Sequence, residues 1–367
     1  MFEKIVETAK ISGMKRILSK IKSSRKERSR FDILKRKRSF IGFLYALPAV
    51  LFLLLFKIWP LFFGLWISFW KWGFAPERFL GLGNYITIFT QDIIYTDPVF
   101  GLQIGDLGQS FLVTLYYSIG IVPVSIVLSF IIAYFLYYKF NDRLKGILRT
   151  VFFLPYITSQ VAAIMVFKWI FHPNVGIANS VLTTIGIKAQ QWLSDAEPIF
   201  SKILSLFGSN WPDFIPIELG GPSLALIIIM IFAIWSSIGF NILIFLAGLS
   251  NIPRELYDAA KVDGANAYHM IKHITLPLVS PMIFLLSIVS VIASFESFNA
   301  FYVFSNGEGS PMGTTMSLPL YIFRNFYDYG RVGYASALSV LLFLILLGLT
   351  IFQRKIAEKY VYYQEAG

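Results

Sequence analysis

Few side chains in this sequence have the types and spacing that could support chemistry. His269 and His273 lie four residues apart in a helix-like stretch, which places both imidazoles on one face. The Met-Ile-Lys between them lacks the glutamate of zinc hydrolases, and no third ligand is evident. No glycine is followed by lysine, so the usual phosphate-binding loop is absent, and the lack of cysteine excludes thiol chemistry. We predict that this chain has no catalytic residue, binds no metal and holds no cofactor.

A second kind of polar residue lies inside apolar stretches. Such residues are costly in a membrane and therefore indicate function. Glu296 and Asn299 are surrounded by aromatic residues, an arrangement that suits a hydroxyl-rich solute such as a sugar. Trp235 and Asn241 form a second candidate set in an earlier apolar run. The predicted substrate-pathway residues are Glu296, Asn299, Phe295, Tyr302, Trp235 and Asn241.

The elements that must position these residues are membrane helices. The 367 residues are 56% hydrophobic and only 14% charged, whereas soluble domains carry about a quarter charged residues. Apolar runs of about twenty residues recur and are too long for barrel strands, so we predict an all-α, polytopic transmembrane helix bundle of six spans. Four serines in the fifth span, Ser287 to Ser297, recur every three or four residues and predict close helix packing. The predicted spans are Phe40–Phe69, Ser110–Tyr138, Thr150–Phe171, Ser223–Leu249, Leu278–Phe304 and Ala335–Phe352.

Charge fixes the expected orientation. Residues 1–40 hold 14 Lys and Arg against four acidic residues, or +10 of the net charge of +11. A basic stretch beside a first span indicates a cytoplasmic N-terminus, and this adjacency favours membrane lipid over nucleic acid as its partner. The tail is either an amphipathic helix on an anionic leaflet or a partly disordered topogenic segment. Six spans then place both termini in the cytoplasm. We divide the chain into a basic tail (1–39), a transmembrane domain (40–355) and a C-terminal tail (356–367).

The polar segment 251–277 interrupts the last apolar spans on the cytoplasmic side. It is expected to form a helix at 253–264, a glycine turn and a second short helix that stops at Pro277. Pro253 suits the first helical position, and Glu255 lies in the first turn beside the positive end of the helix dipole. Gly264 can adopt the left-handed conformation that ends a helix. We expect a partner protein to dock on this segment.

The same segment carries a specific resemblance. Asp258-Ala259-Ala260 is followed after three residues by Gly264, after nine more by Ile274 and after one more by Leu276-Pro277. This spacing resembles the Glu-Ala-Ala signature of permease subunits of binding-protein-dependent ABC importers. Asp258 stands where that signature has glutamate. Four other stretches are similar to the carbohydrate branch, of maltose, multiple-sugar or glycerol-phosphate type, whereas Ser305–Pro311 departs from its Gly-Gly-Pro turn. Those four are Gly81–Tyr85, Leu144–Arg149 with Phe153–Tyr156, Trp169–Gly176 and Tyr334–Leu338.

The resemblance implies the fold of a type I ABC importer permease and a non-catalytic subunit of a sugar importer in the bacterial inner membrane. It implies alternating access, a second permease subunit, two copies of a cytoplasmic ATPase that bind ATP and Mg²⁺, and an extracytoplasmic solute-binding protein. An ion-coupled secondary transporter is the alternative, and a membrane-embedded enzyme a weaker one, because no catalytic cluster is evident. The implied ATPase-coupling residues are Glu255, Asp258, Ala259, Ala260, Gly264, Ile274, Leu276 and Pro277.

Overall fold

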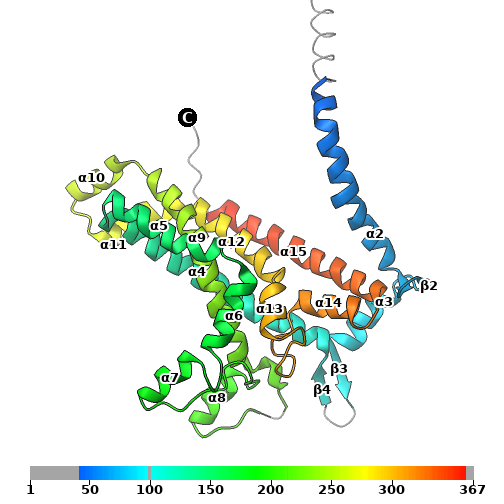
Figure 1. The fold of residues 1–367 in the computed structure, drawn as a ribbon. Helices are drawn as coiled ribbons and strands as arrows, with labels where there is room; N and C mark the ends of the chain where they lie inside the picture. Colours follow the sequence, from blue (N-terminus) through cyan, green and yellow to red (C-terminus); the bar gives the residue numbers. More distant parts are fainter. Residues whose placement is uncertain (1–40, 98–100, 213, 361–367) are drawn as a thin grey trace, which may run out of the picture. The chain divides into compact units, whose positions relative to one another are not determined.

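The computed structural model describes residues 41–97, 101–212 and 214–360 (Figure 1). The predicted basic tail at 1–39 lies outside these residues. Contacts divide the chain into two units, residues 1–64 and 65–367. The first unit consists, in its described part, of most of the first span, a helix over Ile41–Ile67 whose apolar window is not buried at all. This helix contains a π-turn, η1 (Leu54–Ile58), before α2 (Trp59–Ile67), and the π-turn lies just ahead of Pro60.

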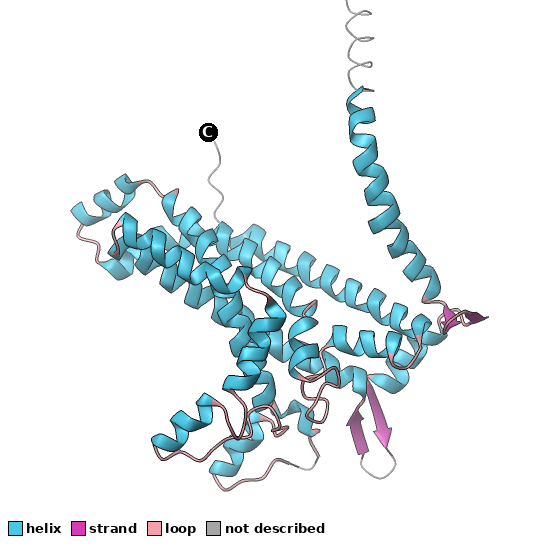
Figure 2. Cartoon of the chain, viewed as in Figure 1, coloured by secondary structure: helices cyan, strands magenta, loops and turns pink. Residues whose placement is uncertain are grey.

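The second unit is a helix bundle (Figure 2). Its long helices are α4 (Asp106–Lys139), α9 (Leu224–Ser250), α12 (Leu276–Phe295) and α15 (Val332–Tyr360). Together with the first span, five described helices are long and apolar enough to cross a membrane, or six if the bent pair α5 (Asp142–Ile157) and α6 (Gln160–Ile170) counts as one. The predicted all-α transmembrane bundle is confirmed. α15 continues eight residues past the predicted end at Phe352, so the predicted C-terminal tail begins inside this helix.

The core of the second unit forms around α9. This helix packs against α4, α5 and α12, and fully buried Phe232 and Phe245 belong to two separate apolar clusters along it. Gly239 permits the close crossing of α9 with α5, because a Cβ there would lie 2.1 Å from the carbonyl oxygen of Phe152. α9 is therefore the central helix of the packing formed by α4, α5 and α12.

Short elements fill the connections that the sequence predicts as loops. The long connection after α6 holds short helices of its own, α7 (Ile177–Thr184), α8 (Ile199–Leu206) and η3 (Ile217–Gly220). The two antiparallel hairpins before α4 were not predicted, because their strands are only three or four residues long. The other elements before α4 are β1 (Trp70–Trp72), β2 (Pro76–Phe79), α3 (Gly83–Thr87), η2 (Ile88–Asp92), β3 (Ile94–Asp97) and β4 (Gly101–Ile104).

Two of the predicted spans are broken. α5 and α6 meet at an angle of 93°, and the chain at Thr158 between them is extended. Pro155 removes a backbone donor just before this bend, and the Thr158 hydroxyl donates to the carbonyl of Pro155 over 2.8 Å. The predicted fifth span is likewise interrupted, because α12 ends at Phe295 and α13 (Asn299–Phe304) begins after a three-residue break. Both spans were wrongly predicted as continuous.

Candidate functional site

The polar segment protrudes from one end of the second unit as a helical hairpin, residues 251–275, which Figure 1 shows as α10 and α11. α10 covers Arg254–Val262, so the helix starts one residue later than predicted: Pro253 has an extended ψ of 134° and precedes the first helical residue. Gly264 has a φ of +78°, as expected. The amide of Ala265 donates to Ala260 over 2.9 Å and that of Gly264 to Lys261 over 3.1 Å, the two bonds of a Schellman helix end.

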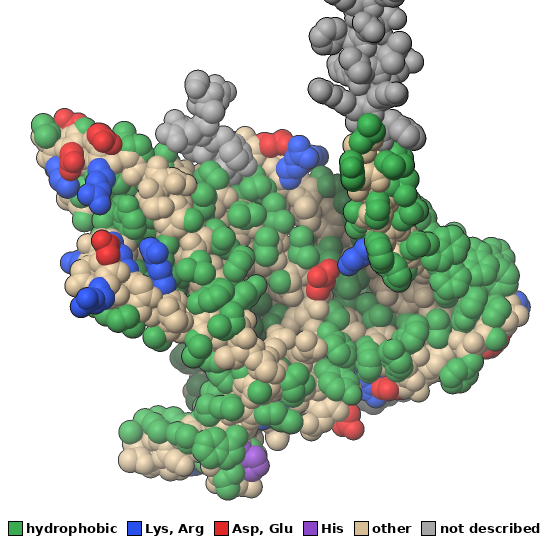
Figure 3. Space-filling view, turned by 45° about the horizontal axis from the view of Figure 1, so that its top comes forward, with side chains coloured by type: hydrophobic (Ala, Val, Ile, Leu, Met, Phe, Trp, Pro, Cys, Tyr) green, Lys and Arg blue, Asp and Glu red, His purple; other side chains and the backbone are tan. Residues whose placement is uncertain are grey.

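The surface of this hairpin mixes charged and apolar side chains. Asp258 is exposed and lies 2.9 Å from Lys261, while Ala259 is exposed and Ala260 half-buried. Val262 is 87% exposed, and Leu256 and Tyr268 are also exposed. Figure 3 shows the charged groups gathered at this end of the unit, next to the basic residues at the start of α5. The exposed apolar and aromatic side chains, framed by charged ones, are suited to contact with another protein.

One tyrosine connects the hairpin to the spans. The Tyr257 hydroxyl lies 2.9 Å from Oγ1 of Thr275, a fully buried residue at the foot of α12. The Tyr257 ring also contacts the ring of Tyr138 near the end of α4, with centroids 5.7 Å apart. Tyr257 thus contacts both α4 and the start of α12. Sequence analysis missed Tyr257, although it directly precedes the Asp-Ala-Ala triplet.

The second half of the hairpin runs into the next span without a stop. α11 (Ala267–Met270), the π-turn η4 (Ile271–Thr275) and α12 form one helix over Ala267–Phe295, so the predicted end at Pro277 is wrong. Pro277 lies in the first turn of α12, directly after the wider π-turn that accommodates its missing N–H. Ile274 packs beside the core cluster, while Leu276 is exposed.

The two histidines of α11 and η4 make their hydrogen-bonding contacts within the hairpin. Nδ1 of His269 lies 2.8 Å from Oδ1 of Asn266, and Nδ1 of His273 lies 3.1 Å from the carbonyl oxygen of His269. The rings stack with centroids 5.8 Å apart. In the described part of the chain no three His, Asp or Glu side chains are grouped as a metal would need.

The breaks in the third and fifth spans meet. Nδ2 of Asn299, at the start of α13, donates to Oε1 of Gln160, at the start of α6, over 3.1 Å. At the other end of α6, the Lys168 ammonium donates to the carbonyl of Val303 over 2.9 Å and to Oδ1 of Asn306 over 2.7 Å. α6 and α13 are therefore joined at both ends. Sequence analysis missed Gln160.

The predicted pathway residues divide into two groups. Glu296, Asn299, Tyr302 and Trp235 are exposed in this single chain, and Glu296 terminates α12 rather than lying inside a span. Phe295 and Asn241 are both 2% exposed, so neither can reach a solute in this conformation. We call the surface formed by Gln160, Glu296, Asn299, Tyr302 and Trp235 the pathway surface.

Two of the four serines in the stripe of the fifth span, Ser294 and Ser297, have the packing role predicted for them. Ser294 donates to the hydroxyl of Ser118 over 2.8 Å, and the Ser297 hydroxyl lies 3.3 Å from that of Tyr117. Both partners belong to α4. Close approach of α12 to α4 thus depends on small side chains with paired hydroxyls.

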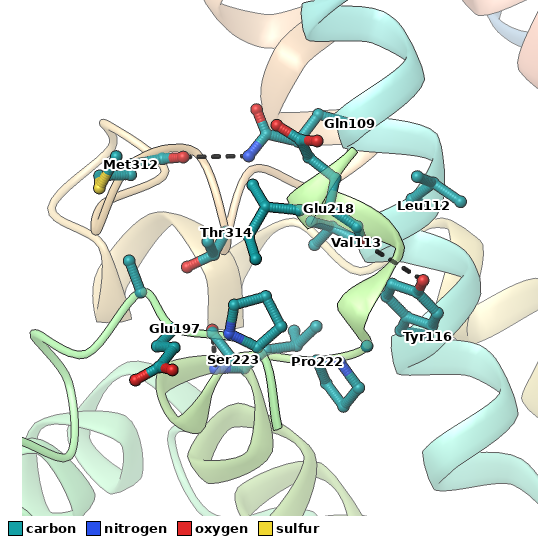
Figure 4. A pocket seen from close by; sticks show the side chains of 15 residues that line it. Gln109, Leu112, Val113, Tyr116, Glu197, Glu218, Pro222, Ser223, Met312 and Thr314 are labelled. Carbon is teal, nitrogen blue, oxygen red and sulfur yellow. Dashed lines mark hydrogen bonds between the residues drawn. The ribbon is translucent and has the colours of Figure 1, made fainter. Parts of the chain in front are cut away.

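A cavity of about 300 Å³ opens at the end of the second unit opposite the hairpin, which we call the far end (Figure 4). Its walls come from the start of α4, the segment 196–198, the segment 217–223 with η3, and the loop at 312–314. These stretches are far apart in sequence, so no local pattern could have predicted the cavity.

Comparison with known proteins extends these observations. Residues 125–361 match the family model described as "Binding-protein-dependent transport system inner membrane component". The chain is 31% identical over 332 residues to the "Probable ABC transporter permease protein YesP" of Bacillus subtilis, covering 90% of this chain and 94% of that one. It is 30% identical to the "Trehalose/maltose transport system permease protein MalF" of Thermococcus litoralis, covering 89% and 96%.

The fold is also that of a solved transporter chain. A chain in the crystal structure of a bacterial alginate ABC transporter, in complex with an alginate pentasaccharide-bound periplasmic protein, aligns with a TM-score of 0.68. The identity is 20%, and the alignment covers 88% of this chain and 96% of that one. The chain therefore belongs to the family of binding-protein-dependent transport system inner membrane components, and it is a permease subunit of an ABC importer that leaves ATP hydrolysis to separate subunits.

Proposed function

We propose that this permease imports a sugar or oligosaccharide across the bacterial inner membrane by alternating access. The hairpin carries this proposal, because its left-handed turn and its exposed Asp258 and Ala259 offer a docking surface that Tyr257 connects to two spans. The solute class is supported by relatives named for trehalose/maltose, lactose and arabinooligosaccharides. Amide, carboxylate and aromatic groups of the pathway surface suit a hydroxyl-rich solute.

The hairpin end faces the cytoplasm in this proposal. Basic residues at the start of α5, on the hairpin and in the last turns of α15 all lie at this end, and cytoplasmic loops carry an excess of such residues. Both termini are then cytoplasmic and the far end is extracytoplasmic. The ATPase that we expect at the hairpin binds ATP and Mg²⁺.

A second permease chain completes the pathway. Glu296 and Asn299 are exposed in this single chain, although polar groups at membrane depth need protein or water around them. A second permease subunit facing the pathway surface supplies that environment. Each of the two permeases then offers one hairpin to one of two ATPase copies.

The hairpin is tested by reconstitution. The tagged chain is expressed with its partners and purified, and the preparation is examined for a copurifying ATPase. The same preparation, reconstituted in proteoliposomes, is assayed for ATP-dependent uptake of a panel of sugars. We expect an ATPase to copurify and deletion of residues 255–264 to abolish uptake. No associated ATPase, together with normal uptake after the deletion, would overturn the proposal.

The role of the pathway surface in solute transport is tested by one isosteric substitution. Glu296→Gln removes a charge without changing side-chain volume, so we expect sugar-stimulated uptake to fall while ATPase association persists. Glu255→Gln on the exposed face of α10 removes a charge elsewhere and separates a pathway effect from a coupling effect. Normal uptake in the Glu296 variant would exclude that residue from the pathway.

A further inference from the structure

The far-end cavity has a chemistry that the pathway surface does not share. Leu112, Val113 and Leu226 give it an apolar floor, and at one point of the rim the Gln109 amide donates to the carbonyl of Met312 over 3.0 Å (Figure 4). Met312 itself is 85% exposed. The cavity is thus a partly apolar hollow whose rim is open to solution.

The charged side chains of the cavity wall are all acidic. Glu197 and Glu218 line it, and among the described residues no Lys, Arg or His does. The Tyr116 hydroxyl donates to the backbone carbonyl of Glu218 over 3.3 Å, so it leaves that carboxylate unengaged. Glu197 accepts a hydrogen bond from the Ser201 hydroxyl over 3.2 Å, and neither carboxylate forms an ion pair with a described residue. An occupant that matches this wall carries a positive charge beside an apolar group.

An adjoining cavity of about 240 Å³ extends the acidic surface. It shares Gln109 and Met312 with the first and adds the carboxylates of Asp106 and Glu308. Arg324, the one cation among its described lining residues, already contacts Asp328 over 3.0 Å and the carbonyl of Glu308 over 3.2 Å. The acidic field therefore spans both cavities with little internal compensation.

The size of the main cavity limits what it can hold. A volume of about 300 Å³ lies at the lower end of the range for small-molecule sites. It accommodates one or two side chains more readily than an oligosaccharide, and Tyr116 supplies the only aromatic ring among the described residues of its wall. The cavity is also lined by segments of the far end alone, away from Gln160 and Asn299.

We propose that this cavity is the socket for a protruding segment of the solute-binding protein, in which an apolar side chain enters the hollow and an adjacent Lys or Arg faces Glu197 and Glu218. This inference rests on the proposed function, because that function makes the far end extracytoplasmic. Carboxylates around such a socket steer a basic partner and set its register, while the apolar floor supplies contact area. Weak, rapid docking of this kind is screened by salt.

The test titrates the purified binding protein against the reconstituted transporter and follows ATPase stimulation. In Glu197→Gln with Glu218→Gln we expect the half-maximal concentration of binding protein to rise about tenfold at low ionic strength, because two steering charges are lost. The maximal rate should not change, and the dependence on salt should become shallower. Glu77→Gln, whose carboxylate pairs with Lys71 on the β1–β2 hairpin over 2.7 Å, is the matched control and should titrate like the unaltered chain.

A second variant separates shape from charge. Ala196→Trp fills the cavity without changing its charge, and we expect its higher half-maximal concentration to persist at high salt. An unchanged titration in both variants overturns the proposal. So does a change in solute uptake with an unchanged titration, which would identify a small cationic ligand instead. Failure of the proposed function has a different signature, because the unaltered chain would then show no stimulation by any binding protein.

Discussion

The hairpin end and the far end of this permease are built on different principles. At the hairpin end, Asp258, Gly264 and Thr275 belong to one short stretch of chain, and local backbone geometry fixes their arrangement. At the far end, Gln109 and Met312 are 203 residues apart and meet only because several spans pack together. The first arrangement forms with the local helices, whereas the second requires the whole bundle.

This difference has a mechanical consequence. The hairpin is short, exposed and anchored to the spans by the hydroxyl contact of Tyr257 with Thr275 and the ring contact with Tyr138. The far end is joined to the bundle from several directions, including the bonds of Lys168 to the end of α13 and its flanking loop. Changes at the hairpin should therefore act on coupling, and changes at the far end on recognition.

The largest effect that the comparison predicts is at Gly264. A valine there must adopt a φ near +78°, which costs a β-branched residue about 1–2 kcal/mol. Because about 1.4 kcal/mol is a factor of ten in an equilibrium, sugar uptake per ATP hydrolysed should fall about tenfold. The measurement is uptake and hydrolysis in the same proteoliposomes.

The control for this prediction uses the open space around Gly264. A Cβ added there would meet no atom of the chain within 4 Å, so the penalty is one of backbone conformation. Gly264→Asn, which tolerates the left-handed region, should keep most of the coupling. Equal loss in the Asn and Val variants would show that contact with a partner, and not the turn, requires glycine.

A smaller effect is expected at Tyr257. Tyr257→Phe keeps the ring beside Tyr138 but removes the hydroxyl contact with buried Thr275, at a cost of about 1 kcal/mol. Coupling should therefore drop about fivefold, with ATPase binding unchanged. Tyr268→Phe is the matched control, because Tyr268 is exposed on the same hairpin. If both variants couple normally, the hairpin moves the spans through its backbone alone.

The contrast between the two ends also explains what sequence could predict. The spacing from Asp258 to Pro277 predicted the hairpin and its left-handed glycine, since both depend on neighbouring residues. The bend after Ile157 and the break after Phe295 were missed, because the polar residues there, Thr158–Gln160 and Glu296–Asn299, are too few to divide the long apolar runs around them. Asn241 was predicted to line the pathway on its type alone, and the packing around α9 buries it.

At the far end, Gln109→Leu should have a modest effect. The change keeps side-chain volume but removes the bond to Met312 at the cavity rim, a loss of about 0.5 kcal/mol at a partly exposed site. The half-maximal concentration of binding protein should rise about twofold, while uptake per ATP hydrolysed stays the same. A change in that ratio would mean that the far end also takes part in coupling.

The smallest effect is expected at Asp258, the one departure from the family signature. Its carboxylate is exposed and paired only with Lys261 in the next turn, and such surface pairs contribute about 0.2–1 kcal/mol. Asp258→Glu lengthens the side chain by one methylene and keeps the charge, so coupling should change by less than about twofold. Asp258→Asn keeps the shape of the side chain but removes its charge. A clear loss of coupling in this variant alone would show that a cationic side chain of the ATPase pairs with the Asp258 carboxylate. If both variants lose coupling, the position demands both the charge and the length of aspartate, and the ATPase cleft is shaped to this chain and not to the glutamate of the signature.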